Sequence, residues 1–412
     1  MSATQLLIGP FKQAITLAGL EAKGPIEDEE IHIIEDAGIL VENGVILQVD
    51  DFEKLAKSAT QVYEIHGTHV CIPGFVDSHT HICFGGTRAR DYAARNNGKT
   101  YLEIAKEGGG IWDTVGKTRV ATEDELVMNT IKRTNRHLKE GVTTIEVKSG
   151  YGLSVHEELK MLRAIRKAST STSSDLISTC LAAHILPKDF DGDHKAYLDY
   201  ISSELFPALQ KEQLTNRIDA FIEEEAFSSK ITTEYFQKAK ELGFDITVHA
   251  DQFSTGGSEV AVNVGAVSAD HLEASGAREI EILAKSETVA TALPGASMGL
   301  GVAFTPGRKI LDAGGSLAIA SDWNPGSAPM GDLLMQAAVL GSYEKLSNAE
   351  VLSGLTFRAA AALRLSDRGK LEAGMKADLA IFETEHYNEI FYHQGKLKPS
   401  MVFKAGTEVI KK

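Results

Sequence analysis

Two histidines, His79 and His81, lie one residue apart at the end of the apolar run 74–81. Because side chains alternate along a β-strand, both would point to the same face if this run is a strand. Imidazole nitrogens gathered on one face are suitable ligands for a transition metal. This motif alone indicates a metal only weakly, since two histidines at this spacing also serve in packing.

The positions of the other histidines strengthen this interpretation. Five of the thirteen histidines fall at the C-terminal ends of short apolar runs, and an aspartate ends the last run. These residues are His79, His81, His184, His249, His271 and Asp322. Imidazoles with one carboxylate suit zinc or iron(II) and leave a position open for water, whose pKa the ion lowers. A closed structural site is the alternative, but the additional histidines favour hydrolytic catalysis.

Eight short apolar runs would have to position these side chains. The runs are 74–81, 143–148, 175–184, 217–223, 245–249, 267–271, 288–293 and 316–322. Segments of helical period alternate with them, for example 124–139, 155–167 and 232–242. Eight alternations predict an α/β fold, a (β/α)8 TIM-type barrel, better than an open doubly wound sheet. In such a barrel the C-terminal strand ends surround the mouth, where the histidines would meet.

Both ends of the chain have a different pattern, rich in short β segments. The expected strands are 31–35, 38–41, 45–49, 62–65 and 69–72 near the start, with 371–383 and 399–410 near the end. The two ends are predicted to combine into one small β-sandwich beside the barrel. The predicted division is therefore 1–72 and 368–412 for the sandwich and 73–367 for the barrel.

Composition limits the classes of function. The net charge of −15 opposes nucleic acid and anionic membranes as partners, so an anionic substrate would need a local cation in the site. Cys71, Cys83 and Cys180 are odd in number and lack CxxC spacing, which favours a reducing compartment. The sequence contains no recognisable signal peptide or membrane span. A cytoplasmic location is the resulting expectation.

Longer motifs resemble those of a known family. The segments PGFVDSHTH at 73–81 and GKLEAGMKADL at 369–379 resemble the amidohydrolase superfamily. Within it, the chain resembles the imidazolonepropionase family, the ring-opening hydrolases of histidine degradation. The motifs that carry this resemblance are FGGTR at 84–88, GGGI at 108–111, EVKSGYGL at 146–153, HADQ at 249–252, SADHL at 268–272 and SDWNPGS at 321–327. Together they span almost the whole chain.

The resemblance implies a reaction and a set of residues. The reaction is hydrolysis of imidazolone-propanoate, a small anionic lactam, to N-formimidoyl-glutamate with one divalent ion, Zn²⁺ or Fe²⁺. The implied metal ligands are His79, His81, His249 and Asp322. The implied substrate contacts are Arg88, Tyr151, His184, Gln252, Asn324, Gly326 and Ser327. A homodimer is a further expectation at the level of the family.

Individual side chains suggest how these roles would be divided. Arg88 would bind the propionate carboxylate, because a guanidinium can contact it through two N–H groups. Tyr151 would donate to the same carboxylate or to the ring carbonyl, and His184 would polarise that carbonyl as a hydrogen-bond donor. Asp322 or His271 would accept the proton of the attacking water.

Two other functions are compatible with the same fold. Another amidohydrolase activity, such as deamination of a nucleobase, is disfavoured by Gln252, because an amide cannot perform acid–base work. A non-catalytic scaffold of the same fold would be expected to lack some of the ligands.

Segment 96–112, with its glycine run at 108–110, is the expected lid over the site.

Overall fold

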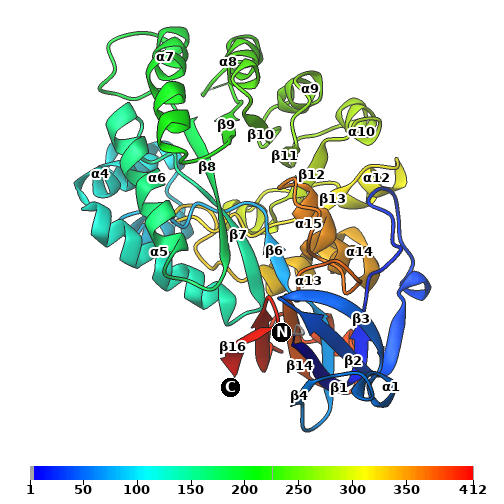
Figure 1. The fold of residues 1–412 in the computed structure, drawn as a ribbon. Helices are drawn as coiled ribbons and strands as arrows, with labels where there is room; N and C mark the ends of the chain where they lie inside the picture. The colour runs from blue at the N-terminus through cyan, green and yellow to red at the C-terminus, as the bar shows by residue number, and fades with distance from the viewer. Residues whose placement is uncertain (1–3, 225, 412) are drawn as a thin grey trace.

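A computed structural model describes residues 4–224 and 226–411. It contains a barrel of eight parallel strands surrounded by helices and, next to it, a second mixed sheet that includes both ends of the chain (Figure 1). This confirms the predicted fold class. The barrel strands lie side by side in sequence order from β6 to β13. Among the described residues, no helix is long and apolar enough to cross a membrane.

Each of the eight predicted apolar runs overlaps a barrel strand. The strands are β6 (Phe75–Asp77), β7 (Val142–Lys148), β8 (Asp175–Ala183), β9 (Arg217–Phe221), β10 (Asp245–Ala250), β11 (Ser268–His271), β12 (Val289–Ala292) and β13 (Leu317–Ile319). Their side chains are mostly buried on both faces, as expected for parallel strands covered by helices.

The first strand is shorter than the sequence predicts. It ends at Asp77, so His79 and His81 lie in the segment beyond it and not on the strand itself. The backbone of this segment pairs with the chain that follows β13: the Asp322 N–H donates to the His79 carbonyl (3.0 Å) and the His81 N–H to the Trp323 carbonyl (3.0 Å). The barrel therefore closes just above its first and last strands, at the level of the two histidines.

Asp77 holds this closure from below. Its Oδ1 accepts a hydrogen bond from the Ser321 N–H (2.9 Å), and its Oδ2 accepts one from the Ser321 hydroxyl (2.5 Å). The Nε2 atom of His137 lies 3.1 Å from the same Oδ2. All three side chains are fully buried. A carboxylate in this position joins the first strand, the last strand and a helix of the outer layer.

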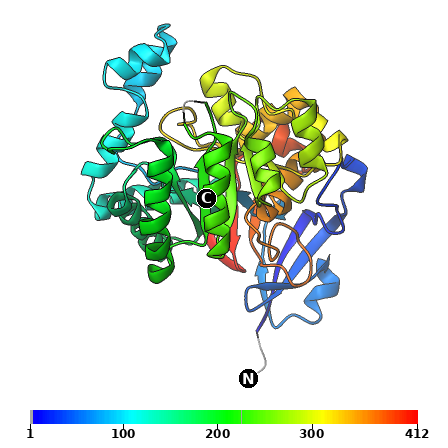
Figure 2. The ribbon, with the colours of Figure 1, turned by 90° about the horizontal axis from the view of Figure 1, so that it is seen from above.

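Helices follow most of the barrel strands and cover them. The helices of the barrel layer and its extensions are α2 (Ala89–Asn96), α3 (Tyr101–Lys106), α4 (Ile111–Val120), α5 (Glu123–Leu138), α6 (Val155–Ser169), α7 (His194–Glu212), α8 (Ser229–Glu241), α9 (Gly257–Asn263), α10 (Ala277–Ala284), α11 (Pro294–Leu300), α12 (Gly307–Asp312), α13 (Leu333–Glu344), α14 (Asn348–Leu355) and α15 (Phe357–Ala361). The predicted helical segments 124–139, 155–167 and 232–242 correspond to α5, α6 and α8. In Figure 2 the cyan segment that contains α2 and α3 stands out from the rest of the molecule.

The second sheet has the strand order β16-β15-β14-β5-β1-β2-β3, and β4 pairs with β1. Strands from the two chain ends meet where β14 pairs with β5. The elements are β1 (Gln5–Ile15), η1 (Asp28–Glu30), β2 (Ile33–Glu42), β3 (Val45–Asp51), α1 (Phe52–Ala56), β4 (Gln61–Glu64), β5 (His69–Pro73), β14 (Leu379–Glu383), α16 (Asn388–Tyr392), β15 (Met401–Lys404) and β16 (Thr407–Lys411). The strands share their own cluster of buried apolar side chains. The division at 72/73 and 367/368 stays a prediction.

The sequence prediction misses β1, although this strand pairs with three others. The reason is Gly9-Pro10 in its middle, a dipeptide that usually interrupts a strand. Here the pairing with β2 shifts register between Ile8 and Phe11, so the proline occupies an irregularity of the strand.

Replacement of Asp77 by alanine should destabilise the fold. The substitution leaves two buried donors of Ser321 without an acceptor, which should lower the free energy of unfolding by about 2 to 4 kcal/mol. Urea denaturation followed by circular dichroism measures this loss. Asp124→Ala, at a 91% exposed side chain, is the control and should change stability by less than about 0.5 kcal/mol. Equal effects of the two variants would contradict the role given to Asp77.

Candidate metal centre and substrate site

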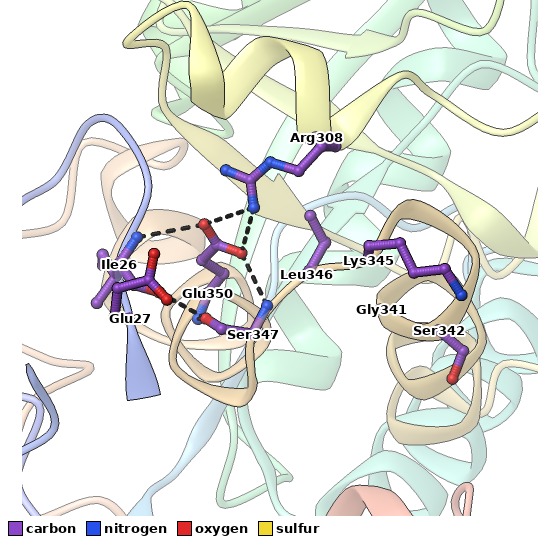
Figure 3. Close-up of a pocket in the computed structure, with 9 residues that line it drawn as sticks. All are labelled: Ile26, Glu27, Arg308, Gly341, Ser342, Lys345, Leu346, Ser347 and Glu350. Carbon is purple, nitrogen blue, oxygen red and sulfur yellow. Dashed lines mark hydrogen bonds and ion pairs between the residues drawn. The ribbon is translucent and has the colours of Figure 1, made fainter. Parts of the chain in front are cut away.

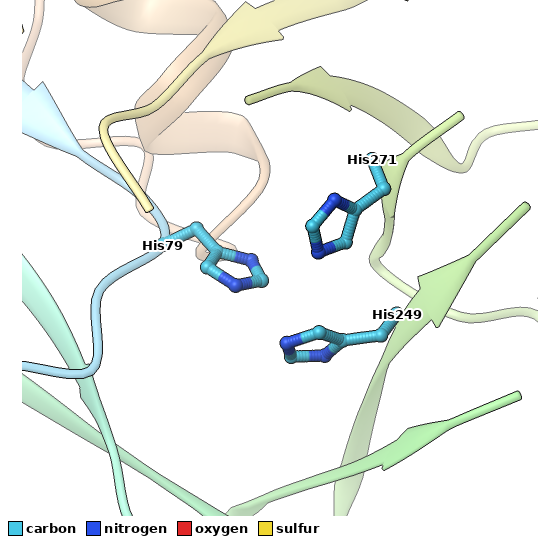
Figure 4. A group of neighbouring side chains, drawn as sticks. All are labelled: His79, His249 and His271. Atoms are coloured by element: carbon cyan, nitrogen blue, oxygen red, sulfur yellow. The ribbon is translucent and has the colours of Figure 1, made fainter. Parts of the chain in front are cut away.

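Imidazole rings from several strand ends converge at the mouth of the barrel. His249 lies near the end of β10 and His271 ends β11, while His79 and His81 follow β6. Figure 4 shows the rings of His79, His249 and His271 facing a common centre. The Nε2 atom of His81 is 3.2 Å from Nε2 of His79 and 3.3 Å from Nε2 of His249. The structure thus brings the predicted histidines together.

Asp322 completes this cluster from the chain that follows β13. Its Oδ1 lies 3.4 Å from Nε2 of His81 and 3.6 Å from Nε2 of His79. Its backbone is left-handed (φ 47°), as is that of His271 (φ 86°). Residues other than glycine rarely adopt this conformation, and such strained positions concentrate at functional sites.

These residues fit a bound cation. Oδ1 of Asp322 is buried and accepts no hydrogen bond. In the group His79, His81 and Asp322, and again in the group His79, His249 and His271, one potential ligand atom from each residue lies within 4.8 Å of the others. Several lone pairs directed at one buried point repel each other unless a positive charge lies between them. Nitrogen with one carboxylate oxygen is a donor set for zinc or iron(II).

Carboxylates lie behind two of the histidines. Oδ2 of Asp270 is 2.7 Å from Nδ1 of His79, and Oδ2 of Asp219 is 2.9 Å from Nδ1 of His249. A carboxylate in this position keeps a proton on Nδ1, so Nε2 offers its lone pair to the metal. Burial, the largest cause, lowers the pKa of His249 to about 4 and that of His79 well below its usual value. Both rings are therefore neutral, the form that binds metals.

The sequence reasoning gave no role to Asp219 or Asp270. Asp270 stands directly before His271, and Asp219 lies within the fourth barrel strand. Both are fully or almost fully buried carboxylates inside apolar strands. A charged residue in the middle of such a run was the available signal, because charges are rarely buried without a partner.

His271 differs from the other histidines in its electrostatic surroundings. Its Nδ1 lies 3.5 Å from Oε2 of Glu273, a carboxylate that also accepts a hydrogen bond from the Ser297 hydroxyl (2.9 Å). Burial acts to lower the pKa of His271, but the charges of Glu273 and Asp322 outweigh it, and the pKa is raised. Among the clustered histidines, His271 is thus well suited to accept a proton.

The tautomer of His184 is set by a backbone carbonyl. Its Nδ1 lies 2.9 Å from the carbonyl oxygen of Gly150, which can only accept, so Nδ1 carries the proton. Burial, followed by the neighbouring His81 and His249, lowers the pKa of His184 to about 3, so the ring is neutral. Its Nε2 is then an acceptor. This tautomer differs from the donor role expected from the sequence.

Tyr151 lies in a loop that a buried carboxylate organises. Glu158 accepts hydrogen bonds from the backbone N–H groups of Gly150 (3.0 Å), Gly152 (2.8 Å) and Leu153 (2.8 Å). The ring of Tyr151 is centred 5.9 Å from that of His81 and 5.7 Å from that of His184. Glu158 therefore fixes both Tyr151 and, through Gly150, the acceptor of His184.

Arg88 meets the turn that follows Asp322. A Cβ atom added at Gly326 would overlap Nη1 of Arg88, so the guanidinium lies directly against this turn and would have to move for any larger residue. Asn324 shapes the turn: its Oδ1 accepts from the N–H groups of Gly326 (2.7 Å) and Ser327 (2.8 Å), and its Nδ2 donates to the Asp322 carbonyl (2.8 Å). The predicted residues Arg88, Asn324, Gly326 and Ser327 are thus assembled next to the candidate ligand Asp322.

Gln252 and the expected lid lie around the same mouth. Gln252 is half-buried in the loop after β10, where Glu223 accepts a hydrogen bond from the N–H of the next residue, Phe253 (2.8 Å). Within the expected lid, the Gly110 N–H donates to Asp91 (2.8 Å), which also pairs with Arg88 (2.9 Å). The lid is therefore connected to the substrate side, and its closure stays a prediction.

A separate open pocket of about 570 Å³ lies between residues 26–27 and helices α13 and α14 (Figure 3). Its Arg308 is paired with Glu350 at 2.9 Å. Glu350 also accepts hydrogen bonds from the N–H groups of Ile26 (3.2 Å) and Ser347 (2.8 Å). These polar groups satisfy one another, and the predicted site residues do not line this pocket, so it is distinct from the site predicted from the sequence.

Comparison with solved structures agrees with this architecture. A variant of triazine hydrolase matches with a TM-score of 0.77 and 18% identity over 99% of this chain and 95% of its own. An adenosine deaminase from Xanthomonas campestris with bound zinc matches with a TM-score of 0.72 and 17% identity over 99% and 93%. At such identities these likenesses show the fold alone.

Sequence comparison defines the family. The profile of the amidohydrolase family matches residues 94–409, so the chain belongs to the amidohydrolase family. Proteins named imidazolonepropionase are more similar in sequence to this chain than the solved structures above. That of Deinococcus radiodurans is 42% identical over 92% of this chain and 94% of its own, and that of Clostridium tetani is 37% identical over the full length of both. Within the amidohydrolases, the chain belongs with the imidazolonepropionases.

The metal site predicts that a divalent ion stabilises the folded protein. Zn²⁺ at about 1,000 times its Kd should raise the free energy of unfolding by about 4 kcal/mol. Asp322→Ala should remove most of this gain, because it deletes a proposed ligand that is buried beside His79 and His81. His386→Ala, at an exposed histidine outside the cluster, should preserve the gain. Thermal unfolding with and without chelator measures the difference, and no gain in the wild type would contradict a metal site.

Proposed function

We propose that this protein hydrolyses the ring amide C–N bond of 4-imidazolone-5-propanoate to give N-formimidoyl-L-glutamate. The relatives named imidazolonepropionase support this reaction. The observation that carries it is the position of Arg88 against Gly326, in the turn that follows Asp322. In a chain of net charge −15, a guanidinium beside the proposed metal site favours a small anionic substrate.

The proposed ligands of one divalent ion, Zn²⁺ or Fe²⁺, are His79, His81, His249 and Asp322. When bound, such an ion supplies a water of lowered pKa and polarises the carbonyl under attack. Zinc is named in the solved structures of an adenosine deaminase and an atrazine chlorohydrolase that share the fold. His271 lies close enough to His79 and His249 to be an alternative ligand.

The substrate would be held at both of its ends. Arg88 would bind the propionate carboxylate, with Tyr151 and the Ser327 hydroxyl as further donors. His184, in the tautomer set by Gly150, would accept a hydrogen bond from a ring N–H. The amide of Gln252 can both donate to and accept from the ring. These contacts would orient the lactam carbonyl toward the attacking water.

His271 would move the proton. Its Nδ1 faces Glu273, so its Nε2 faces the cluster and can accept a proton from the attacking water and return it to the leaving ring nitrogen. Asp322 is the second candidate, because its Oδ1 is buried among the same rings. Burial opposes ionisation of Asp322, yet the neighbouring histidines lower its pKa, which makes it the weaker base.

The alternatives from the sequence have less support. Nucleobase deamination would have to proceed without a carboxylate at position 252, and the full-length relatives carry another name. A non-catalytic scaffold is disfavoured because the proposed ligands all converge in the barrel mouth. We further propose a cytoplasmic enzyme without nucleic-acid or membrane partners and with the capacity to form a homodimer. The three free, buried cysteines agree with a reducing compartment.

The direct test is ring opening of 4-imidazolone-5-propanoate, followed by the loss of its ultraviolet absorbance. The wild type should be active, lose activity with a chelator and regain it with Zn²⁺ or Fe²⁺. Arg88→Met should lower kcat/KM about 10- to 100-fold, because a charged hydrogen bond to the carboxylate contributes about 1.5 to 3 kcal/mol. Arg278→Met, at an exposed arginine, should leave kcat/KM unchanged. A wild type with no turnover would refute the proposed function.

The assignment of the proton to His271 predicts a shift in the pH profile. A base acts when it is unprotonated, so kcat/KM should rise as the pH passes through the pKa of His271. Glu273 raises this pKa, so Glu273→Gln should move the acid limb of the profile to lower pH. Glu385→Gln, at an exposed position, is the control. An unmoved acid limb, or near-normal turnover in His271→Ala, would leave Asp322 as the proton carrier.

A further inference from the structure

Lys148 is a fully buried cation behind the histidine cluster. It is the last residue of β7, and its Nζ lies 2.7 Å from Oε1 of Glu146 and 2.9 Å from Oδ2 of Asp219. Oδ2 of Asp270 lies 3.8 Å away. Lysine is almost never fully buried without partners, and here it has three carboxylates around it. None of the roles described above uses this side chain.

Lys148 shares its carboxylate oxygens with the metal-binding histidines. Oδ2 of Asp219 contacts both Lys148 Nζ and Nδ1 of His249. Oδ2 of Asp270 accepts the hydrogen bond of His79 Nδ1 and faces the same Nζ. Two chains of contacts, each from ammonium to carboxylate to imidazole, therefore start at one side chain and end at two proposed ligands.

The third carboxylate connects Lys148 to the backbone between His79 and His81. Oε2 of Glu146 accepts a hydrogen bond from the Thr80 N–H (3.3 Å), while Oε1 contacts Lys148. The Thr80 hydroxyl in turn donates to the Glu146 carbonyl (2.6 Å). The orientation of the segment that carries both histidines thus depends on the same network.

We propose that Lys148 is a positioning residue for the metal centre, which aligns His79 and His249 through Asp270 and Asp219. This inference rests on the metal site of the proposed function. Three carboxylates buried around one point repel each other, and without the ammonium they would move apart. His79 and His249 would then lose the acceptors that keep the proton on Nδ1 and direct Nε2 to the metal.

The charge of Lys148 and its proposed positioning role have opposite effects on metal affinity, which makes the proposal testable. The ammonium also repels a divalent cation, so a lysine without a positioning role would weaken metal binding, and its removal would tighten it. Loss of the partners behind metal-binding histidines instead weakens binding about 10- to 100-fold. The sign of the change in Zn²⁺ affinity therefore separates the two roles.

The experiment measures the Zn²⁺ Kd of the purified, metal-free protein by competition with a chromophoric chelator. Lys148→Met should raise the Kd about 10- to 100-fold. Lys148→Gln, which retains two N–H donors and is more easily accommodated, should raise it less and decides the question if the first variant does not fold. An unchanged or lower Kd in the folded variant would overturn the proposal.

Two controls separate positioning from general damage to the core. Arg358→Met removes another fully buried cation, one that contacts the backbone carbonyls of Glu21 and Gly24 away from the cluster. It should lower thermal stability and leave the Kd within about twofold. In an Asp219→Asn/Asp270→Asn background, the effect of Lys148→Met on the Kd should shrink to less than about threefold, because the two carboxylates that connect Lys148 to His249 and His79 are gone.

If Lys148→Met raised the Kd by the same factor in that background as in the wild type, Lys148 would act independently of Asp219 and Asp270. That result would overturn the proposal. Failure of the proposed metal site, on which this inference rests, has a different result, because the wild type itself would then not bind Zn²⁺. A wild type that binds Zn²⁺ but does not open the ring of 4-imidazolone-5-propanoate would refute the proposed reaction and leave the role of Lys148 to the comparison of Kd values.

Discussion

The backbone hydrogen bonds that join His79 to Asp322 and His81 to Trp323 close the barrel and also bring the candidate metal ligands together. Parallel strands leave their C-terminal ends at one edge, but the first and last strands must still meet. They meet above β6 and β13, at the level of the ligands. Asp77 holds this seam from below through Ser321. Barrel closure and ligand geometry therefore depend on each other.

Burial determines the electrostatics of the site. Water is largely excluded from the cluster, so each charge needs a partner within a few ångströms, and loss of one partner of a buried pair typically costs about 3 to 5 kcal/mol. Asp219, Asp270 and Glu273 each face the Nδ1 side of a histidine. The same arrangement satisfies these carboxylates and directs the Nε2 atoms to one point.

The proposed substrate side relies on hydrogen bonds to the backbone. The Glu158 carboxylate and the Asn324 side chain accept them from N–H groups of the Tyr151 loop and of the turn at 324–327, and the Gly150 carbonyl accepts one from His184. His184 shows the consequence most clearly, because one carbonyl, that of Gly150, makes its Nε2 an acceptor. In the proposed function, Arg88 supplies a positive charge for an anionic ligand in an acidic protein. Its guanidinium lies against Gly326, where a Cβ atom would displace it.

The sequence by itself determined the eight apolar runs, the barrel they form and the residues at their ends, because periodicity and position along a strand are local properties. His249, His271 and Asp322 could be placed at the mouth on this basis. Only the tertiary structure decided where β6 ends and how β1 continues across Gly9-Pro10. It also decided which ring nitrogen of His184 carries the proton. The partners of Lys148, Asp219 and Asp270 were likewise decided by the tertiary structure. The sequence shows that these charges lie within apolar strands, but the contacts that neutralise them form only when distant strands become neighbours around the barrel.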